Sequence, residues 1–272
     1  MAVLKLADGG ALHYDVTGPE SAETIVFLHG FTMDSSQWDP QIEVFAEQYR
    51  CITYDLRGFG KSSDPTGTYD HIEDFAAILE HFELTEPHVV GLSLGGLVAH
   101  VFAARYPGRM ASLTLVSPGA RGFIWKERRP VEVALDYGKD HTIDETKAFW
   151  MGLPLFASLD NYPQAKADVA RMLDDYSGWH FANYDHQAAY PPEPGPHTID
   201  VPTLVIRGAR DVQGYYDIAK VLADSIPNAC LKTYEDCGHM LSLEQPDRLN
   251  RDLGAFLSVV SKEIAQKAKK KA

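Results

Sequence analysis

One stretch of the sequence decides the fold: His88-Val89-Val90-Gly91-Leu92-Ser93-Leu94-Gly95-Gly96. A short apolar run rich in β-branched residues ends at Gly91, and a helix-forming run follows over residues 97–105. A strand, a sharp turn and a helix around Gly-x-Ser-x-Gly are typical of a nucleophile elbow, which exposes a serine hydroxyl at a helix N-terminus. The glycines are needed because bulkier residues two positions before and after the serine would collide. A glycine-rich turn with an incidental serine is the alternative, and the rest of the chain must decide.

The composition restricts the classes of function. The chain has 272 residues, of which 45% are hydrophobic, which suits one large α/β domain or a core domain with an insertion. A formal net charge of −13 argues against a general nucleic-acid binder, because such a protein needs a basic face for phosphate. The three cysteines, Cys51, Cys230 and Cys237, include no pair at metal-ligand spacing, and we expect free thiols in a reducing compartment.

The first residues of the sequence lack a charged segment followed by a long apolar run, so no signal peptide is expected. No stretch approaches the roughly 18 apolar residues that span a bilayer. We therefore expect a cytoplasmic protein that does not insert into membranes and that is a monomer or a homodimer.

Strand and helix patterns alternate along most of the chain. A hairpin is expected over residues 3–16, around Asp8-Gly9-Gly10. Apolar runs predict strands over 24–28, 51–55, 88–90, 113–116, 201–207 and 230–234. Helical patterns cover 38–49, 69–82, 97–105, 215–225 and 247–265. Such alternation with short connections predicts a mostly parallel, doubly wound sheet with helices on both faces.

The alternation is interrupted by an insertion over residues 120–198. This segment has helical patterns and no convincing strand, and it contains three of the four tryptophans, Trp125, Trp150 and Trp179. It ends in a proline-rich stretch, residues 191–196. We therefore divide the chain into a core domain, residues 1–119 and 199–272, and a helical insertion over the carboxyl edge of the sheet.

Three side chains follow strands in an order that suggests nucleophilic catalysis. A serine hydroxyl needs a histidine to take its proton, and the histidine needs a carboxylate to orient it. Ser93, Asp211 and His239 lie in the turns that follow three predicted strands, and parallel strands bring such positions to one edge of the sheet. A lone histidine after a strand is more often structural, but one that completes this order is much less often so.

A tetrahedral intermediate also needs an oxyanion hole. Two backbone N–H groups aimed at the former carbonyl oxygen supply it. Leu94, directly after the serine, is expected to give one amide. Phe31, in the loop after the strand over 24–28, is expected to give the other.

The chain resembles the α/β-hydrolase superfamily, of the small serine esterase, C–C hydrolase and perhydrolase-like type. The resemblance covers nearly the whole chain and rests on His29-Gly30-Phe31, Asp55-Leu56-Arg57-Gly58-Phe59-Gly60-Lys61-Ser62, Gly91-Leu92-Ser93-Leu94-Gly95-Gly96, Gly208-Ala209-Arg210-Asp211 and Gly238-His239. It implies an eight-stranded, mostly parallel sheet with a helical cap inserted after the sixth strand. It also implies cofactor-free hydrolysis of carboxylic esters.

Apolar residues of the insertion and of two loops of the core domain predict the substrate class. The residues expected to line an apolar pocket are Phe31, Trp125, Trp150, Phe156, Trp179 and Met240. They favour a small to medium, mainly apolar ester, although most of the insertion residues could instead form the insertion's own core. His180 and His186 lie six residues apart, which is not a recognised metal spacing, so no metal is expected.

Other reactions remain open on the same three residues. The resemblance includes C–C bond hydrolases, but these carry small residues and a tryptophan where this chain has Phe31 and Met240. Enol-lactonases and perhydrolases share the layout. A ligand-binding receptor on this fold is the non-enzymatic alternative, although a pure binder has no need for all four catalytic parts.

Overall fold

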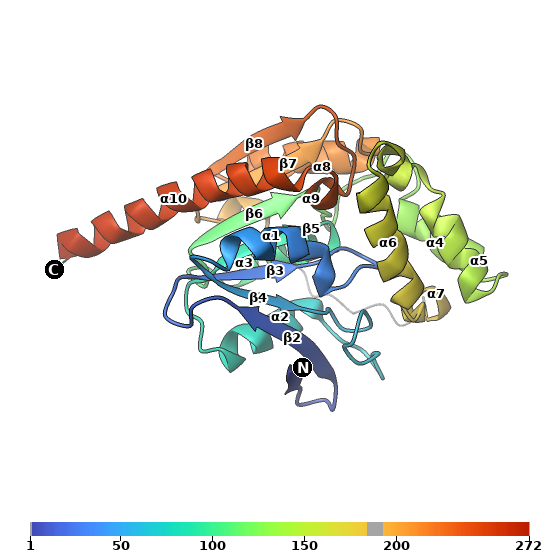
Figure 1. The fold of residues 1–272 in the computed structure, drawn as a ribbon, viewed down its shortest axis with the longest axis horizontal. Helices are drawn as coiled ribbons and strands as arrows, with labels where there is room; N and C mark the ends of the chain where they lie inside the picture. The colour runs from blue at the N-terminus through green and yellow to red at the C-terminus, as the bar shows by residue number, and fades with distance from the viewer. Residues whose placement is uncertain (1, 184–192, 272) are drawn as a thin grey trace.

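A computed structural model describes residues 2–183 and 193–271, and the whole chain builds on an eight-stranded sheet (Figure 1). The strands are β1 (Ala2–Lys5), β2 (Ala11–Thr17), β3 (Thr24–Leu28), β4 (Arg50–Tyr54), β5 (His88–Leu92), β6 (Ser112–Val116), β7 (Thr203–Gly208) and β8 (Ala229–Tyr234). Their order across the sheet is β1-β2-β4-β3-β5-β6-β7-β8. The predicted α/β-hydrolase fold is confirmed.

The direction of the strands places the functional edge. Strand β2 runs antiparallel to both of its neighbours, and all pairs from β4 to β8 are parallel. Every residue of β3, β5, β6 and β7 is buried, as expected for strands covered on both faces. The carboxyl ends of these strands therefore meet at one edge, where loops and helix N-termini can form a site.

Helices cover both faces of the sheet. Figure 1 shows α1 (Asp39–Phe45) and α10 (Pro246–Lys271) in front of the sheet, with α2 (His71–His81), α3 (Leu94–Arg105) and α8 (Gln213–Ser225) on the other face. Helix α3 is apolar almost all round because it packs between the sheet and α2. The helix predicted over 38–49 is shorter than expected. A 3₁₀ helix, η1 (Ser35–Trp38), precedes α1, which has a proline in its first turn and ends at Phe45.

The chain between β6 and β7 forms helices at the carboxyl edge of the sheet (Figure 1). They are α4 (Pro130–Gly138), α5 (Ile143–Met151), η2 (Pro154–Asn161), α6 (Pro163–Asp175), α7 (Trp179–Ala182) and η4 (Pro196–Thr198). The described parts of this segment, 117–183 and 193–202, contain no strand. The predicted proline-rich stretch begins at 191, and its first two residues lie outside the described residues.

Candidate active site

Ser93 lies in the sharp turn between β5 and α3. Its backbone has φ 53° and ψ −109°, which is rare for a residue with a side chain. The two flanking glycines make the turn possible: a Cβ on Gly91 would lie 2.4 Å from the carbonyl oxygen of Gly95. A Cβ on Gly95 would lie 2.2 Å from the carbonyl oxygen of Leu28 in the next strand. The strand, turn and helix expected around this serine are therefore all present.

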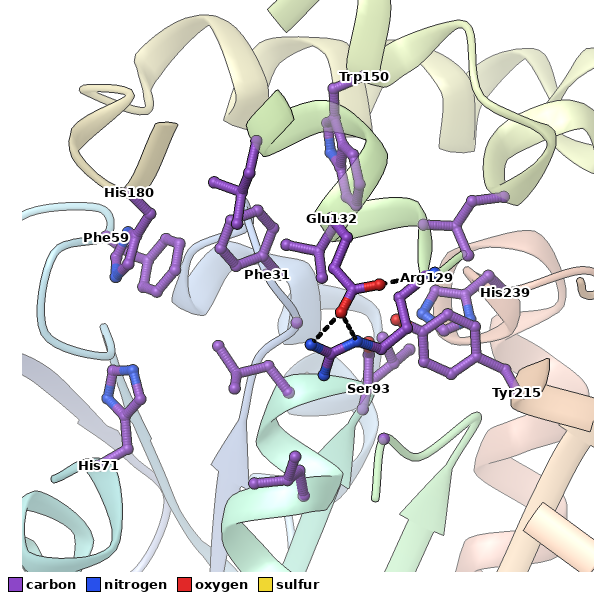
Figure 2. Close-up of a pocket in the computed structure, with 18 of the residues that line it drawn as sticks. Phe31, Phe59, His71, Ser93, Arg129, Glu132, Trp150, His180, Tyr215 and His239 are labelled. Carbon is purple, nitrogen blue, oxygen red and sulfur yellow. Dashed lines mark hydrogen bonds and ion pairs between the residues drawn. The ribbon is translucent and has the colours of Figure 1, made fainter. Parts of the chain in front are cut away.

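Asp211 and His239 form a buried pair beside this turn. Asp211 follows β7 and His239 follows β8, and their Oδ2 and Nδ1 atoms lie 2.8 Å apart. The second carboxylate oxygen of Asp211 accepts a hydrogen bond from the amide of Val212 at 2.8 Å. With Nδ1 donating to Asp211, Nε2 of His239 is the basic nitrogen. Figure 2 shows His239 and Ser93 on the same side of one cavity, which both line.

Glu244 fixes the loop that carries His239. Its two carboxylate oxygens accept hydrogen bonds from the amide of Gly238 at 2.6 Å, the amide of Met240 at 3.1 Å and the hydroxyl of Ser158 at 2.9 Å. Gly238 and Met240 are the two neighbours of His239, and Ser158 belongs to η2. The same carboxylate therefore ties the histidine loop to the insertion. Burial raises the pKa of Glu244 against these hydrogen bonds.

Two backbone amides beside Ser93 lack a partner within residues 2–183 and 193–271. They belong to Phe31 and Leu94, whereas the amides next to them are engaged. The amide of Gly30 donates to Oε1 of Gln37 at 2.9 Å, and the amide of Gly95 donates to the carbonyl oxygen of His29 at 3.0 Å. Phe31, Leu94 and Ser93 line the same cavity. The two amides are therefore available to a ligand oxygen at this point.

A cavity of about 230 Å³ joins these groups. All six residues predicted for an apolar pocket line it: Phe31, Trp125, Trp150, Phe156, Trp179 and Met240. The ring of Phe31 meets that of Trp150 edge to face at 5.5 Å. Trp150 itself is fixed because its Nε1 donates to the Thr32 hydroxyl at 2.9 Å. The insertion thus supplies much of the wall above Ser93, as Figure 2 shows.

Comparison with known proteins places the chain in a family. The family model for the alpha/beta hydrolase fold matches residues 23–246. The chain belongs to the α/β-hydrolase family. It is 31% identical to a non-heme chloroperoxidase of Streptomyces lividans, over 94% of this chain and 99% of that protein. It is 26% identical to 3-oxoadipate enol-lactonase 1 of Acinetobacter baylyi, over 93% of this chain and 95% of that protein.

A solved structure gives the same result for the fold. The crystal structure of a hydrolase from Pseudomonas aeruginosa is 26% identical and superposes with a TM-score of 0.81, over 94% of this chain and 97% of that chain. Carboxylesterases and C–C bond hydrolases are also among the relatives. These relatives support a hydrolase, and at this level of identity they leave the substrate open.

The sequence of this α/β-hydrolase did not single out Tyr215. This residue lies in α8, four residues after Asp211, and its ring is 4.3 Å from that of His239. Burial raises the pKa of Tyr215 to about 12, the Asp211 carboxylate adds to the shift, and a hydrogen bond with Ser93 opposes it. The phenol is therefore a neutral hydrogen-bonding group beside the serine. Its neighbour Gly214 makes room for Trp125, whose ring would lie 1.9 Å from a Cβ there.

An ion pair at the same cavity was also missed. Arg129 and Glu132 are partly exposed, and Nη2 of Arg129 lies 2.5 Å from Oε1 of Glu132 (Figure 2). The hydrogen bonds from Arg129 lower the pKa of Glu132. The spacing of three residues between Arg129 and Glu132 is common for exposed ion pairs on helices. It therefore did not mark this pair as part of a site.

The remaining predicted residues have structural surroundings. Nδ1 of His180 lies 2.9 Å from the Tyr176 hydroxyl and Nε2 lies 3.0 Å from the Tyr69 hydroxyl, so both nitrogens are engaged. His186 lies outside the described residues. Within the ranges that the structure describes, no cluster of three or more histidine, cysteine or acidic side chains could hold a metal ion.

The cysteines and the hydropathy of the helices add little to the site. Cys51 and Cys237 are buried, Cys230 is exposed, and all three are free thiols. Over the described part of the chain, every helix is too short or too polar to cross a bilayer.

Proposed function

We propose that this α/β-hydrolase is a serine esterase that cleaves carboxylic esters of small to medium, mainly apolar acids. The observation that carries the proposal is the buried Asp211–His239 pair, 2.8 Å apart, beside a serine held in an elbow turn. The two unengaged amides of Phe31 and Leu94 complete the parts that acyl transfer requires.

The reaction follows from these positions. The Ser93 oxygen attacks the ester carbonyl while His239 takes the serine proton, and Asp211 stabilises the imidazolium that forms. The carbonyl oxygen becomes an oxyanion that accepts hydrogen bonds from the amides of Phe31 and Leu94. When the intermediate collapses, His239 gives its proton to the leaving alcohol, and an acyl group stays on Ser93. Water then attacks the acyl-enzyme with His239 as base, which releases the acid and restores the serine.

The cavity supports the substrate class. A volume of about 230 Å³ is below the several hundred Å³ usual for drug-sized ligands, so it suits a small acyl group. Its walls are largely aromatic and aliphatic side chains. We also propose that residues 120–198 act as a cap, because Trp150 and Phe156 from this insertion form part of the wall that meets the substrate.

Lactone hydrolysis is a second candidate on the same residues. The similarity to an enol-lactonase extends over 93% of this chain, and a lactone is an ester whose acid and alcohol belong to one ring. C–C bond cleavage is less favoured because the Phe31 ring, packed against Phe59 and Trp150, occupies space where C–C hydrolases carry small residues.

A panel of nitrophenyl esters and simple lactones with acyl groups from short to long tests the proposal. We expect turnover of short and medium esters, and loss of at least about a thousand-fold in Ser93→Ala, as for removal of a catalytic nucleophile. Ser258→Ala, on an exposed position of α10, is the matched control and should keep full activity. Equal rates in Ser93→Ala and the parent protein would refute the proposal, and a preference for lactones would select the second candidate.

A further inference from the structure

One histidine of the cavity lacks the hydrogen bonds that a buried imidazole normally makes. His71 is the first residue of α2, is 2% exposed and lines the cavity. Its Nδ1 is shielded and has no partner, and neither ring nitrogen makes a hydrogen bond within residues 2–183 and 193–271. A buried polar group without a partner is unfavourable, so such groups in native proteins call for an explanation.

The other histidines on this side of the cavity have their partners. Nδ1 of His29 lies 2.8 Å from the Gly30 carbonyl oxygen, and its Nε2 accepts from the amide of Leu56 at 2.9 Å. Both nitrogens of His180 are engaged by tyrosine hydroxyls. His71 therefore differs from its neighbours although each of the three packs against aromatic rings, as His71 does against Tyr69 at 4.9 Å.

His71 and His239 lie on opposite sides of Ser93. His71 follows β4, Ser93 follows β5 and His239 follows β8, and β5 lies between the other two strands in the sheet. Figure 2 shows the same separation across the cavity. Because His239 protonates the leaving alcohol, the alcohol part of an ester occupies the His239 side. The acyl chain then extends in the other direction, toward His71.

The His71 end of the cavity carries a neutral polar group, and the charged side chains near it are paired. Burial lowers the pKa of His71 well below its usual value, and the neighbouring histidines and arginines lower it further, so the imidazole is neutral. The guanidinium of Arg57 is paired with Asp74 at 2.6 Å, and that of Arg121 is paired with Glu193 at 3.1 Å. Among the described residues, both arginines near this end are already paired with carboxylates, so a substrate carboxylate buried here would be unfavourable. An uncharged oxygen meets no such penalty.

We propose that His71 forms a polar subsite for an uncharged oxygen, a keto or hydroxyl group, near the end of the substrate's acyl chain. This inference rests on the proposed ester hydrolysis and narrows its substrate class from apolar acids to oxo or hydroxy acids. The bound oxygen supplies the hydrogen bond that the imidazole lacks. The oxygen position along the chain selects among substrates, because only one chain length brings it to His71.

Nitrophenyl esters of alkanoic acids of increasing length test the subsite. Each ester is paired with counterparts of the same length that carry a keto, a hydroxyl or a carboxylate group near the chain end. We measure kcat and KM for the parent protein, for His71→Leu and for His71→Gln, which keeps a hydrogen-bonding group. His141→Leu makes the same change at an exposed histidine of the insertion and is the matched control. For each variant we compare the ratio of KM values between the two esters of a pair. A general loss of activity or of folded protein affects both esters equally and therefore leaves this ratio unchanged.

We expect a KM about ten-fold lower for the keto or hydroxy ester than for the alkyl ester at one chain length, the effect of one regained hydrogen bond. His71→Leu abolishes that preference, His71→Gln keeps part of it, and His141→Leu keeps it all. The ester that carries a carboxylate near its chain end is the slowest substrate of each set. If the parent protein hydrolyses paired esters alike, or His71→Leu keeps the preference, the subsite is refuted while ester hydrolysis stands. Absence of turnover with every ester would refute the proposed function itself.

Discussion

The ring of Tyr215 lies 4.3 Å from the imidazole of His239, tilted by 46°. The same tyrosine is half-buried, and its hydroxyl interacts with the Ser93 side chain. One residue therefore contacts both the proposed nucleophile and the proposed base. Because its pKa is raised to about 12, the hydroxyl keeps its proton at neutral pH and can donate to an oxygen at the reaction centre.

Tyr215→Phe removes this donor and keeps the ring that packs on His239. We expect kcat/KM for an alkyl ester to fall about ten-fold, the effect of one lost hydrogen bond. A nitrophenyl ester should lose less, because nitrophenolate leaves without assistance. Steady-state kinetics on both esters measure the difference.

Tyr216→Phe is the control for this change. The Tyr216 ring lies 3.5 Å from the guanidinium of Arg207 and does not line the cavity. Both esters should react as in the parent protein. The expected difference between the esters assumes that the Tyr215 hydroxyl donates a hydrogen bond to the oxygen of the leaving alcohol. An equal fall in kcat/KM for the alkyl and nitrophenyl esters in Tyr215→Phe would contradict that role.

Glu244→Gln tests the brace of the His239 loop. The amide of glutamine can accept at only one end, so its NH₂ group would face at least one of the donors on Gly238, Met240 and Ser158. We expect the free energy of unfolding to fall by about 1–3 kcal/mol, the range for a buried group left without its partner. His239 lies between Gly238 and Met240, so loss of either hydrogen bond displaces the catalytic imidazole. We therefore expect kcat to fall by a larger factor than KM rises.

Urea titration and steady-state kinetics on Glu244→Gln measure both effects. Glu235→Gln, an exposed position on the same loop, is the matched control and should change neither. Normal kcat in a destabilised Glu244→Gln would mean that the carboxylate supports the fold without positioning His239.

Acidification should destabilise the protein through its buried histidines. Burial lowers the pKa of His100 to about 4 and that of His180 to about 3. The unfolded chain, with a histidine pKa near 6.5, binds protons in the window between these values while the folded chain does not. The stability contributed by the neutral histidines is therefore complete above pH 6.5 and falls as the pH drops through this window.

His100→Asn isolates one of these contributions. Each such histidine adds up to about 1.4 kcal/mol per pH unit to the slope of unfolding free energy against pH. We expect that slope, from urea titrations between pH 7 and 5, to decrease in His100→Asn and to stay the same in the exposed control His141→Asn. An unchanged slope in His100→Asn would contradict a buried neutral imidazole at this position.

The sheet and the elbow could be predicted because each depends mainly on short stretches of sequence: apolar runs for the strands and glycines for the turn. Short apolar runs rich in β-branched residues favour strands covered on both faces, and Gly91 and Gly95 cannot be replaced because a Cβ at either position would strike backbone atoms. Ser93, Asp211 and His239 could be assigned because each lies in the turn after a strand of the parallel sheet. The helix over 38–49 was predicted too long, since the turn at Phe45 depends on packing that periodicity does not report.

Tyr215, Glu244 and His71 could not be found in the same way. Each acts through a contact that is set by how a helix or loop packs on the sheet, and none belongs to a spacing with a chemical meaning of its own. His71 in particular is one of eleven histidines, and only its missing hydrogen bonds separate it from the others beside the cavity.

Trapping the covalent intermediate on Ser93 tests the central claim most directly. A nitrophenyl ester mixed with excess protein and quenched in acid within the first turnover should add the mass of one acyl group to the protein. Peptide mapping by mass spectrometry should place that mass on Ser93, and neither Ser93→Ala nor protein mixed with the free acid should carry it. Hydrolysis of the ester without any acylated Ser93, or with the acyl group on another residue, would contradict the account.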